Sequence, residues 1–464
     1  MNDIIAFFAF LRCCLGYKGN MSKIVAGMDW QELYSFASKQ ALLGLCFEGI
    51  ERLGKEYPEE LRLNPIGREL LMTWMGKAQL IRRQNMKVNA VAGKLFAMLR
   101  EDGMRCCVLK GQGNALMYPN PYSRTPGDID VWINASRERI MEYARKTFEL
   151  GDDIRLQHLE TSLDGVPVEL HFFPCSMNNP IYHARLQKWF RRNADLQCSH
   201  IVRLPDGAGD IAIPTSPFNV VYQLCHLYHH FFDEGVGMRQ IIDYYHVVCD
   251  FYKVYQKSSK ITPSLFTLKE GSTSHPDPLT LRGEGGNRPT RCSEPLRSKV
   301  GGPSKVSPDC AGWDRWGVSG DTSSVSGSSA SGSSTAVTSS ASTALDVVQR
   351  DLKYLGLWKF AGAVMYVLKE VLGLSEDKMI VPIDEKRGNL LLAEILDGGN
   401  FGRHFTKYAG FTHQSMGKKY FLKIWRNMHF VRYYPAEALS EPIFRTWHFF
   451  WRLKHRRPSL GVFS

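Results

Sequence analysis

The segment that decides the fold of this chain is Arg124-Thr-Pro-Gly-Asp-Ile-Asp-Val-Trp-Ile-Asn134. Asp128 and Asp130 alternate with apolar residues, so a strand here would place its apolar side chains on one face and both acids on the other. Two carboxylates on one sheet face repel each other unless a cation offsets their charge, and Mg²⁺ prefers oxygen ligands. The segment therefore predicts a divalent-metal site. The simpler alternative is an acidic turn that caps a surface strand.

A glycine-rich turn lies upstream of the two acids. The residues from Met104 to Lys110 predict a short buried strand, and Gly111-Gln-Gly-Asn114 follows directly, before an apolar helical turn. Glycine in such a turn lets backbone N–H groups approach a phosphate closely, with the positive end of the helix dipole directed at it. Many strand-to-helix turns use glycine for geometry alone, so both interpretations stay open.

A predicted β-hairpin lies downstream. The segments 158–163 and 166–172 flank an Asp-Gly dipeptide, which is typical of a two-residue hairpin turn. In the second arm the two-residue period places Glu169 and His171 on the face opposite the apolar residues. Glu169 is therefore a candidate third acid, and the alternative is an exposed strand glutamate. His171 is a candidate to orient Glu169, although we favour a hydrogen-bonded structural histidine.

Two predicted helices carry polar pairs at helical spacing. Residues 217–232 predict a helix on which His226 and His230 share a face, four residues apart. This pair is a candidate for Zn²⁺ binding, but the helix lacks the glutamate of the His-Glu-x-x-His motif, and we favour partly buried, hydrogen-bonded histidines. On the next helix, Arg239 and Asp243 are also four apart and are expected to form an ion pair or to line a cleft.

The order of these residues resembles a known family. Lys110-Gly111, then Arg124 with Gly127-Asp-Ile-Asp130, then Val168-Glu-Leu-His171 is similar to the uncharacterised bacterial branch of the DNA polymerase beta-like nucleotidyltransferase superfamily. The resemblance covers much of residues 25–255. It extends to Asp29-Trp30, His226, His230-Phe231, Gly237, Arg239-Gln240 and Asp243.

The resemblance implies a fold and an activity. The fold is α+β, with a small mixed nucleotidyltransferase-type sheet and helices, embedded between helical N- and C-terminal regions. The activity is Mg²⁺-dependent transfer of a nucleoside monophosphate from an NTP, such as ATP, to the hydroxyl group of an unidentified acceptor. Carried over residue by residue, the phosphate-contacting turn falls on Gly111, and the metal-binding and catalytic acids on Asp128, Asp130 and Glu169.

The chemistry of nucleotidyl transfer gives each acid a role. Two cations about 4 Å apart can stabilise both the attacking and the leaving oxygen of an in-line displacement at phosphorus. Asp128 and Asp130 would bridge the two Mg²⁺ ions. Glu169 would complete the site of the metal that activates the acceptor, or would itself accept the proton.

The chain departs from the superfamily pattern in two ways. Gln112 stands where serine usually follows the glycine, and the interval from the turn to the aspartates is longer than in minimal members. We therefore expect Lys110 or Arg124 to carry more of the phosphate contact, with Arg239 as a further nucleotide-binding candidate. For Arg124 the alternative is a simple pair with a surface acid. Gln112 also leaves open a catalytically inactive module on the same fold that binds nucleotide or a protein partner.

Length and composition are typical of an intracellular globular enzyme. The 464 residues can bury a large core and indicate two or three structural units. The 11 cysteines are odd in number and lack disulfide or zinc spacing, which favours a reducing cytoplasm. The apolar segment Ile4–Arg12 is short and lacks a basic leader and a cleavage site. It predicts a docking helix rather than a signal peptide or a membrane span.

The pattern along the chain divides it into five regions. They are a helical N-terminal region (1–101), the transferase core (102–200), a helical region lining the cleft (201–255), an insertion (256–345) and a helical basic C-terminal region (346–464). The insertion abandons periodicity for Gly, Pro, Ser and Thr and cannot bury enough apolar surface to fold alone. A disordered loop and an artefact of the gene model explain it equally well. No feature of the sequence specifies an oligomeric state.

The net charge of +12 owes much to the insertion and to the stretch from Lys418 to Arg457. That stretch interleaves Lys and Arg with Trp, Tyr and Phe, as nucleic-acid-binding and membrane-surface segments do. We favour instead an amphipathic helix whose aromatic side chains pack on the protein while its cations stay in water.

Overall fold

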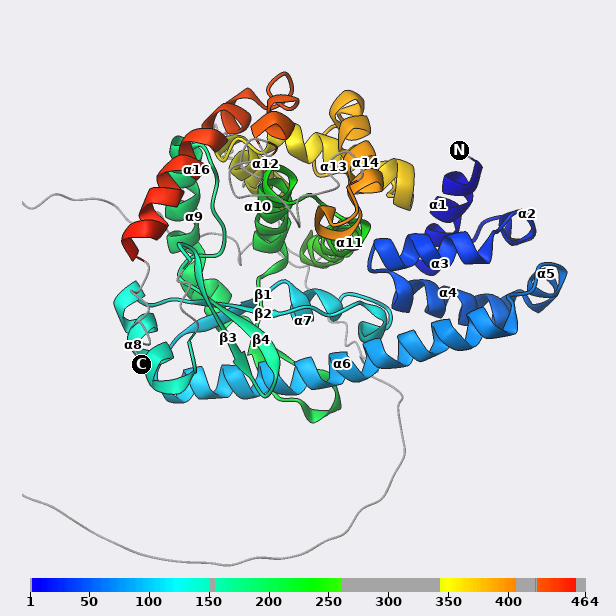
Figure 1. Ribbon diagram of the computed structural model, residues 1–464, viewed down its shortest axis with the longest axis horizontal. Coiled ribbons are helices and arrows are strands. Elements are labelled where there is room, and N and C mark those ends of the chain that lie inside the picture. The colour runs from blue at the N-terminus through cyan, green and yellow to red at the C-terminus, as the bar shows by residue number, and fades with distance from the viewer. Residues whose placement is uncertain (1, 151–154, 260–342, 406–421, 423, 456–464) are drawn as a thin grey trace, which may run out of the picture. The chain divides into compact units, whose positions relative to one another are not determined.

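The structure is a computed structural model that describes residues 2–150, 155–259, 343–405, 422 and 424–455 (Figure 1). These residues belong to one of two compact units of the chain, residues 1–264 and 341–464. Apart from its ends, the predicted insertion 256–345 lies outside the described residues. The labelled elements, in chain order, are α1 (Asn2–Cys14), α2 (Met21–Ala26), α3 (Trp30–Lys39), α4 (Leu43–Glu56), α5 (Pro58–Leu63), α6 (Arg68–Glu101), β1 (Cys106–Leu109), α7 (Gly111–Ala115), η1 (Pro121–Ser123), β2 (Ile129–Ile133), α8 (Arg137–Thr147), β3 (His158–Leu163), β4 (Val166–His171), α9 (Pro180–Ser199), β5 (Ile201–Arg203), η2 (Pro205–Gly207), β6 (Asp210–Ala212), α10 (Ser216–Asp233), α11 (Met238–Ser259), α12 (Ala344–Tyr354), α13 (Trp358–Leu372), η3 (Glu376–Lys378), α14 (Glu385–Gly398), η4 (Asn400–Gly402) and α16 (Pro435–His455).

The strands form a four-stranded mixed sheet and a two-stranded ribbon. The order in the larger sheet is β1-β2-β4-β3, and β5 pairs with β6 in the ribbon. β2 runs parallel to β4, whereas β1 pairs antiparallel with β2 and β3 antiparallel with β4. Helices precede and follow the sheet along the chain (Figure 1). The α+β class predicted from the sequence, with a small mixed sheet between helical regions, is confirmed.

The two faces of the sheet pack against different apolar clusters. Val108 and Val131 face a cluster built with the apolar sides of α6 and α8. Leu109 and Trp132, one residue further along the same strands, face a larger cluster that extends into α10 and α13. There the Trp132 ring lies 6.3 Å from the ring of Phe218 on α10. The predicted two-residue period of the strands is therefore confirmed.

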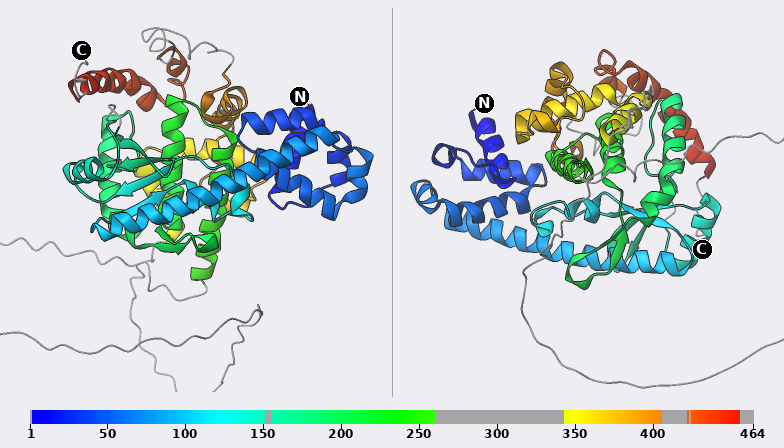
Figure 2. Two further views of the ribbon diagram at one scale, coloured as in Figure 1. Left: turned by 60° about the horizontal axis from the view of Figure 1, so that its bottom comes forward. Right: turned by 180° about the vertical axis from the view of Figure 1, so that it is seen from behind.

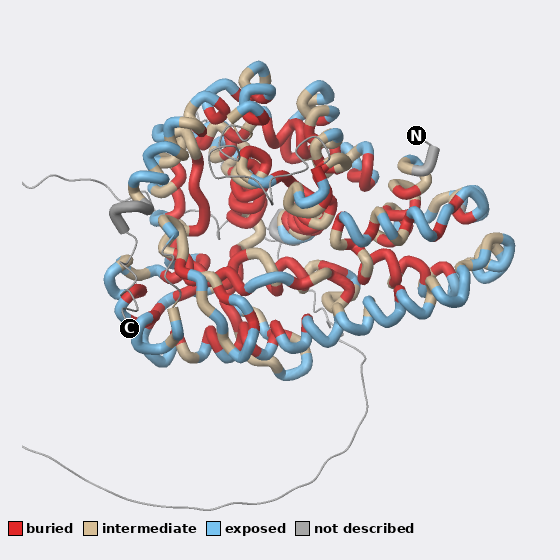
Figure 3. The backbone as a smooth tube through the Cα atoms, in the orientation of Figure 1, coloured by how far each residue is buried: buried red, intermediate tan, exposed pale blue. Residues whose placement is uncertain are grey.

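The hairpin predicted from the sequence is confirmed, and the long helix α6 lies within the predicted helical N-terminal region 1–101. The turn between β3 and β4 consists of Asp164 and Gly165, both with positive φ, at 50° and 72°. This is the backbone conformation that favours an Asp-Gly pair in a two-residue hairpin loop. α6 runs along the sheet in each view and contacts β1 and β4 (Figures 1 and 2). Buried residues on α6 face the sheet and its neighbouring helices, while exposed ones lie on its outer side (Figure 3).

The opening helix docks onto the protein, as its short apolar segment predicts. Phe10 and Leu11 of α1 are fully buried, and α1 contacts α4 and α13. Among the helices that the structure describes, none combines the length and apolarity that a bilayer crossing requires. The described cysteines are free thiols.

The expectation about the basic C-terminal stretch holds only in part, because Phe430 and Tyr434 are buried but other aromatic side chains are not. We expected its aromatic side chains to pack inward and its cations to stay in water, yet Trp425 is 54 % exposed and Phe450 63 % exposed. Arg426 is buried instead, because its guanidinium donates to the carbonyl oxygen of Phe231 and pairs with Glu394. The residues 418–421, 423 and 456–457 of this stretch lie outside the described part of the chain.

Candidate active site

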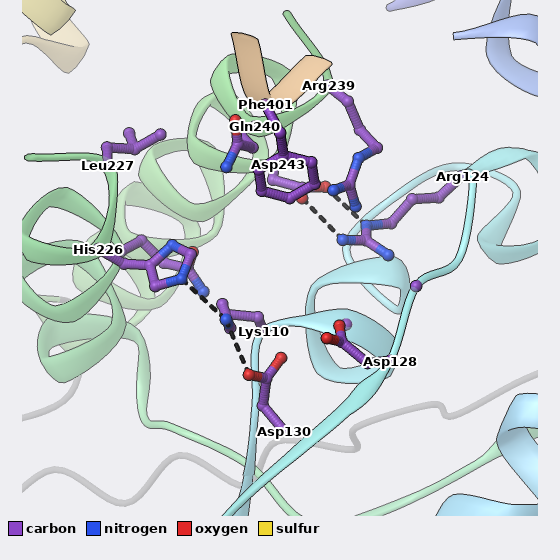
Figure 4. Close-up of a pocket in the computed structure, with 13 residues that line it drawn as sticks. Lys110, Arg124, Asp128, Asp130, His226, Leu227, Arg239, Gln240, Asp243 and Phe401 are labelled. Atoms are coloured by element: carbon purple, nitrogen blue, oxygen red, sulfur yellow. Dashed lines mark hydrogen bonds and ion pairs between the residues drawn. The ribbon is translucent and has the colours of Figure 1, made fainter. Parts of the chain in front are cut away.

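A pocket opens beside the sheet where β1, β2, α10 and α11 meet (Figure 4). Its space, including the part open to solvent, is about 460 Å³. Most of its lining is polar or charged. The lining residues are Lys110, Gly111, Arg124, Gly127, Asp128, Asp130, Gln223, His226, Leu227, Arg239, Gln240, Asp243 and Phe401.

The structure brings the three predicted acids together. Asp128 directly precedes β2, and Asp130 lies within β2, where its Cα partner on the parallel strand β4 is Glu169. His171 links the two strands, since its Nε2 lies 3.0 Å from Asp130 Oδ1 and 3.1 Å from Glu169 Oε2. Of the three acids, Asp128 and Asp130 line the pocket. Their catalytic and metal-binding roles stay predictions.

The charges of these groups are strongly coupled. Repulsion from Asp130, followed by burial, raises the pKa of Asp128 to about 6, although its side chain keeps contact with solvent at the pocket rim. Burial would raise the pKa of Asp130 as well, but Lys110 and His171 hold that pKa well below its usual range. Burial lowers the pKa of His171, yet hydrogen bonds to Asp130 and Glu169 raise it to about 9. At pH 7 a protonated imidazole therefore lies between two carboxylates.

Lys110 occupies the centre of the pocket under backbone strain. Its Nζ lies 2.9 Å from Asp130 Oδ1 and 2.8 Å from His226 Nε2. Its backbone adopts φ 52° and ψ −134°, a conformation that residues with a Cβ rarely adopt. Burial lowers the pKa of Lys110, but Asp130 and its neighbouring acids raise it overall, so the side chain stays charged. The strained backbone thus holds an ammonium group against the acid pair.

The glycine turn has the predicted place but not the family's usual side chain. Gly111, with φ 37°, begins the short helix α7 and lines the pocket. Gln112 is buried, and its side-chain amide donates to Asn89 Oδ1 on α6. Gln112 therefore packs the turn against α6 and offers its donor group to the protein interior rather than to a ligand.

Arg124 and Asp243 form a buried ion pair. Arg124 Nε and Nη2 each lie 2.8 Å from a different oxygen of Asp243, and the hydroxyl of Tyr118 donates to the same carboxylate at 2.7 Å. The partner of Arg124 is thus a buried acid and not a surface one, which corrects the simple-pair alternative. Because Asp243 already accepts from two donors of this guanidinium, the nucleotide-binding role of Arg124 stays a prediction without support from its geometry.

Arg239 lines the same pocket with an unsatisfied donor (Figure 4). The hydrogen bonds to Asp243 come from Arg124 and Tyr118, so of the two expectations for Arg239 and Asp243 the ion pair is wrong, whereas the lining of a cleft agrees with the structure. Arg239 Nε is buried and has no hydrogen-bond partner among the described residues, and the guanidinium carbon lies 5.5 Å from the ring centroid of Phe401. Burial and the nearby charge of Arg124 lower the pKa of Arg239. An anion bound in the pocket would offset both the burial of this guanidinium and its repulsion by Arg124.

The two histidines of α10 form a neutral, hydrogen-bonded pair. The Nε2 atoms of His226 and His230 lie 3.0 Å apart. Burial, together with neighbouring positive charges, lowers the pKa of His226 well below its ordinary value and that of His230 to about 3. The interpretation that we favoured, partly buried and hydrogen-bonded histidines, is confirmed.

Sequence reasoning missed two residues near this site. His158 on β3 lies with its Nε2 3.5 Å from Glu169 Oε1, and it is the strand partner of His171. The predicted hairpin contains enough information to find it, because a two-residue turn places these two histidines opposite each other. Phe401, in η4, reaches the pocket from a distant part of the chain, and no local pattern marks it.

Comparison with known proteins identifies the family. Residues 26–255 match the model of a family described as "Uncharacterised nucleotidyltransferase". The match includes the four-stranded sheet, the three acids, α10 and most of α11. This region of the chain therefore belongs to the uncharacterised nucleotidyltransferase family, and the family predicted from the sequence is confirmed.

A solved structure shares a weaker likeness. The crystal structure of an antigenic nucleotidyltransferase-like protein from Paracoccidioides brasiliensis matches at 14% identity and a TM-score of 0.24, covering 38% of this chain and 89% of that chain. A TM-score this low carries no argument about the site. Among curated proteins, none matches this chain significantly.

Proposed function

We propose that this protein is a Mg²⁺-dependent nucleotidyltransferase that transfers a nucleoside monophosphate from an NTP to a hydroxyl acceptor. Membership of residues 26–255 in the family supports nucleotidyl transfer as the class of reaction. The donor, the metal and the acceptor are argued from the chemistry of the pocket.

The observation that carries the proposal is that one pocket has two repelling carboxylates on one side and an arginine donor without a hydrogen-bond partner on the other. On the side of the sheet, Asp128 and Asp130 repel each other strongly enough to raise the pKa of Asp128 to about 6. On the side of α11, Arg239 has a buried donor without a partner among the described residues. A cation would satisfy the first group and an anion the second. A metal-bound triphosphate supplies both charges in one ligand.

The residues present fit a Mg²⁺ ion. Asp128, Asp130 and Glu169 offer carboxylate oxygens, the ligand type that Mg²⁺ prefers, and repulsion from Asp130 raises the pKa of Asp128 to about 6. When bound, the metal would neutralise developing negative charge on the phosphate oxygens and favour deprotonation of the acceptor.

The protein's own groups have distinct tasks in this proposal. Arg239 binds the phosphates through the donor that has no protein partner. Lys110, held between Asp130 and His226, adds a fixed positive charge close to the site of phosphoryl attack. Glu169 accepts the proton of the acceptor hydroxyl once His171 turns its own proton toward Asp130, which lies within 3.0 Å of it.

Nucleotide binding and adduct formation together test the proposal. Calorimetric titration with ATP and Mg²⁺ should show binding that is lost in Asp130→Asn, while Asp164→Asn in the exposed hairpin turn should bind like the wild type. Incubation with each NTP, Mg²⁺ and candidate acceptors, followed by mass spectrometry, should show a product heavier by one nucleoside monophosphate. Binding without any adduct would favour the inactive nucleotide-binding module. No binding, or binding insensitive to Asp130→Asn, would refute both.

A further inference from the structure

A second group of ligand-type side chains lies beside the acid pair. His158, Glu169 and His171 each place one donor atom within 4.8 Å of the others. His158 and His171 are direct partners in the β3–β4 pairing, and Glu169 lies two residues before His171 on β4. The three side chains therefore project from one face of a two-stranded hairpin, which holds them rigidly.

The distances in this group suit a metal ion with nitrogen and oxygen ligands. Glu169 Oε2 lies 3.1 Å from His171 Nε2, and Glu169 Oε1 lies 3.5 Å from His158 Nε2. Donor atoms on one tetrahedral ion, each about 2.0–2.1 Å from the metal, lie about 3.3 Å from one another. The two measured separations are close to this spacing, and the donor atoms of His158 and His171 lie within 4.8 Å of each other.

His158 has no other partner that explains its position. Both of its ring nitrogens are buried and lack a hydrogen bond among the described residues. Its remaining charged neighbours are Glu160, 3.7 Å away, and Arg155, which pairs with Glu160 at 2.6 Å.

Gln157 and a second pocket border this group of side chains. Gln157 Nε2 lies 3.4 Å from the Nδ1 atom of His171 and donates to the carbonyl oxygen of Pro174. His158 also lines a second pocket, of about 730 Å³ including its open part, formed with residues of α10 and α16. That pocket gives an ion access to His158.

We propose that His158, Glu169 and His171 bind a divalent transition-metal ion of the Zn²⁺ type. Two imidazoles and one carboxylate favour such an ion over Mg²⁺, which prefers oxygen ligands throughout. A fourth position would remain open, as in catalytic sites with three protein ligands. The inference rests on the proposed function and replaces the proton-accepting role given there to Glu169, which would instead hold a transition metal at the hairpin, beside Mg²⁺ at Asp128 and Asp130. On binding, the metal replaces the proton of His171, and that proton is released to solvent.

Titration with Zn²⁺ alone, without nucleotide, tests the inference. The metal-stripped wild type should bind one equivalent, and His158→Gln should weaken that binding by at least about 10-fold, the smaller effect seen even for outer contacts of metal sites. His429→Gln, which changes an exposed histidine outside the site, should leave the affinity unchanged. Unchanged Zn²⁺ binding in His158→Gln, or no binding by the wild type, would overturn the inference.

A spectroscopic measurement covers the case in which His158→Gln does not fold. Co²⁺ added to the wild type should give visible d–d bands of a nitrogen and oxygen environment. Intense thiolate charge-transfer bands would place the ion on cysteine and overturn the inference. The two proposals fail separately: Zn²⁺ binding through His158 in a protein that binds no NTP refutes the proposed function alone. ATP binding that depends on Asp130, with no Zn²⁺ binding, refutes the hairpin site alone.

Discussion

The strained backbone at Lys110 predicts an unusual order of stability for two variants, Lys110→Gly and Lys110→Ala. At φ 52° and ψ −134°, a residue with a Cβ is strained by about 1–3 kcal/mol, whereas glycine is not. Glycine in turn loses about 0.5–1 kcal/mol more backbone entropy on folding than alanine does. Lys110→Gly should therefore be more stable than Lys110→Ala by about 1 kcal/mol. Both variants remove the ammonium from Asp130, so their difference isolates the backbone.

Urea unfolding monitored by circular dichroism measures this difference. Lys188, an exposed residue within α9, provides the matched control, because there Ala should be more stable than Gly by about 1 kcal/mol, the opposite sign. Calorimetry should show that Lys110→Gly and Lys110→Ala lose ATP affinity equally, since both lack the side chain. If Lys110→Ala were as stable as Lys110→Gly, the strain argument would be refuted.

Three further predictions concern buried polar groups. Asp243→Asn leaves Arg124 buried without its carboxylate and should destabilise the protein by about 3–5 kcal/mol in thermal unfolding, and a loss below about 1 kcal/mol would contradict the pairing. Gln112→Ser, although it restores the superfamily residue, breaks the buried hydrogen bond to Asn89. This substitution should lower the free energy of unfolding by about 1–3 kcal/mol without raising the affinity for ATP. A tighter ATP complex in calorimetry would show that the turn contacts phosphate. Burial raises the pKa of Glu437 from 4.5 to about 7, so the folded state binds the extra proton. The contribution of this proton to the free energy of unfolding is complete below pH 4.5. It is lost as the pH rises through 7, and the total loss is about 3 kcal/mol. Glu437→Gln should flatten that part of the stability profile, and an unchanged profile in urea unfolding at several pH values would exclude Glu437 as its source.

Local patterns in the chain predicted much of the sheet. The alternation in residues 129–133 placed Asp130 and the apolar residues on opposite faces, and the Asp-Gly pair predicted the hairpin that carries Glu169. These predictions succeed because the period of a strand and the conformation of a two-residue turn are set by neighbouring residues. The same information placed His171 on the face of the acids.

Contacts between distant segments could not be predicted in this way. Arg124 was expected to bind phosphate or a surface acid, but it pairs with Asp243, a residue 119 positions away. Arg426 was expected to lie in water, but it is buried against Phe231 and Glu394. In both cases a long side chain has several chemically suitable partners, and the packing of whole helices decides which of them lies within reach.

By itself, then, the sequence determined which residues of each strand carry charge, where the hairpin turns and which family residues 26–255 resemble, since these follow from short-range order along the chain. Tertiary structure alone decided that β2 and β4 lie side by side, so that Asp130 meets Glu169. It also decided that Lys110 reaches His226 across the pocket and that His158 comes to lie against Glu169. The physical reason is that a cluster of charges is stable only where the surrounding apolar packing fixes its members at contact distance, and that packing draws on elements from the entire described chain.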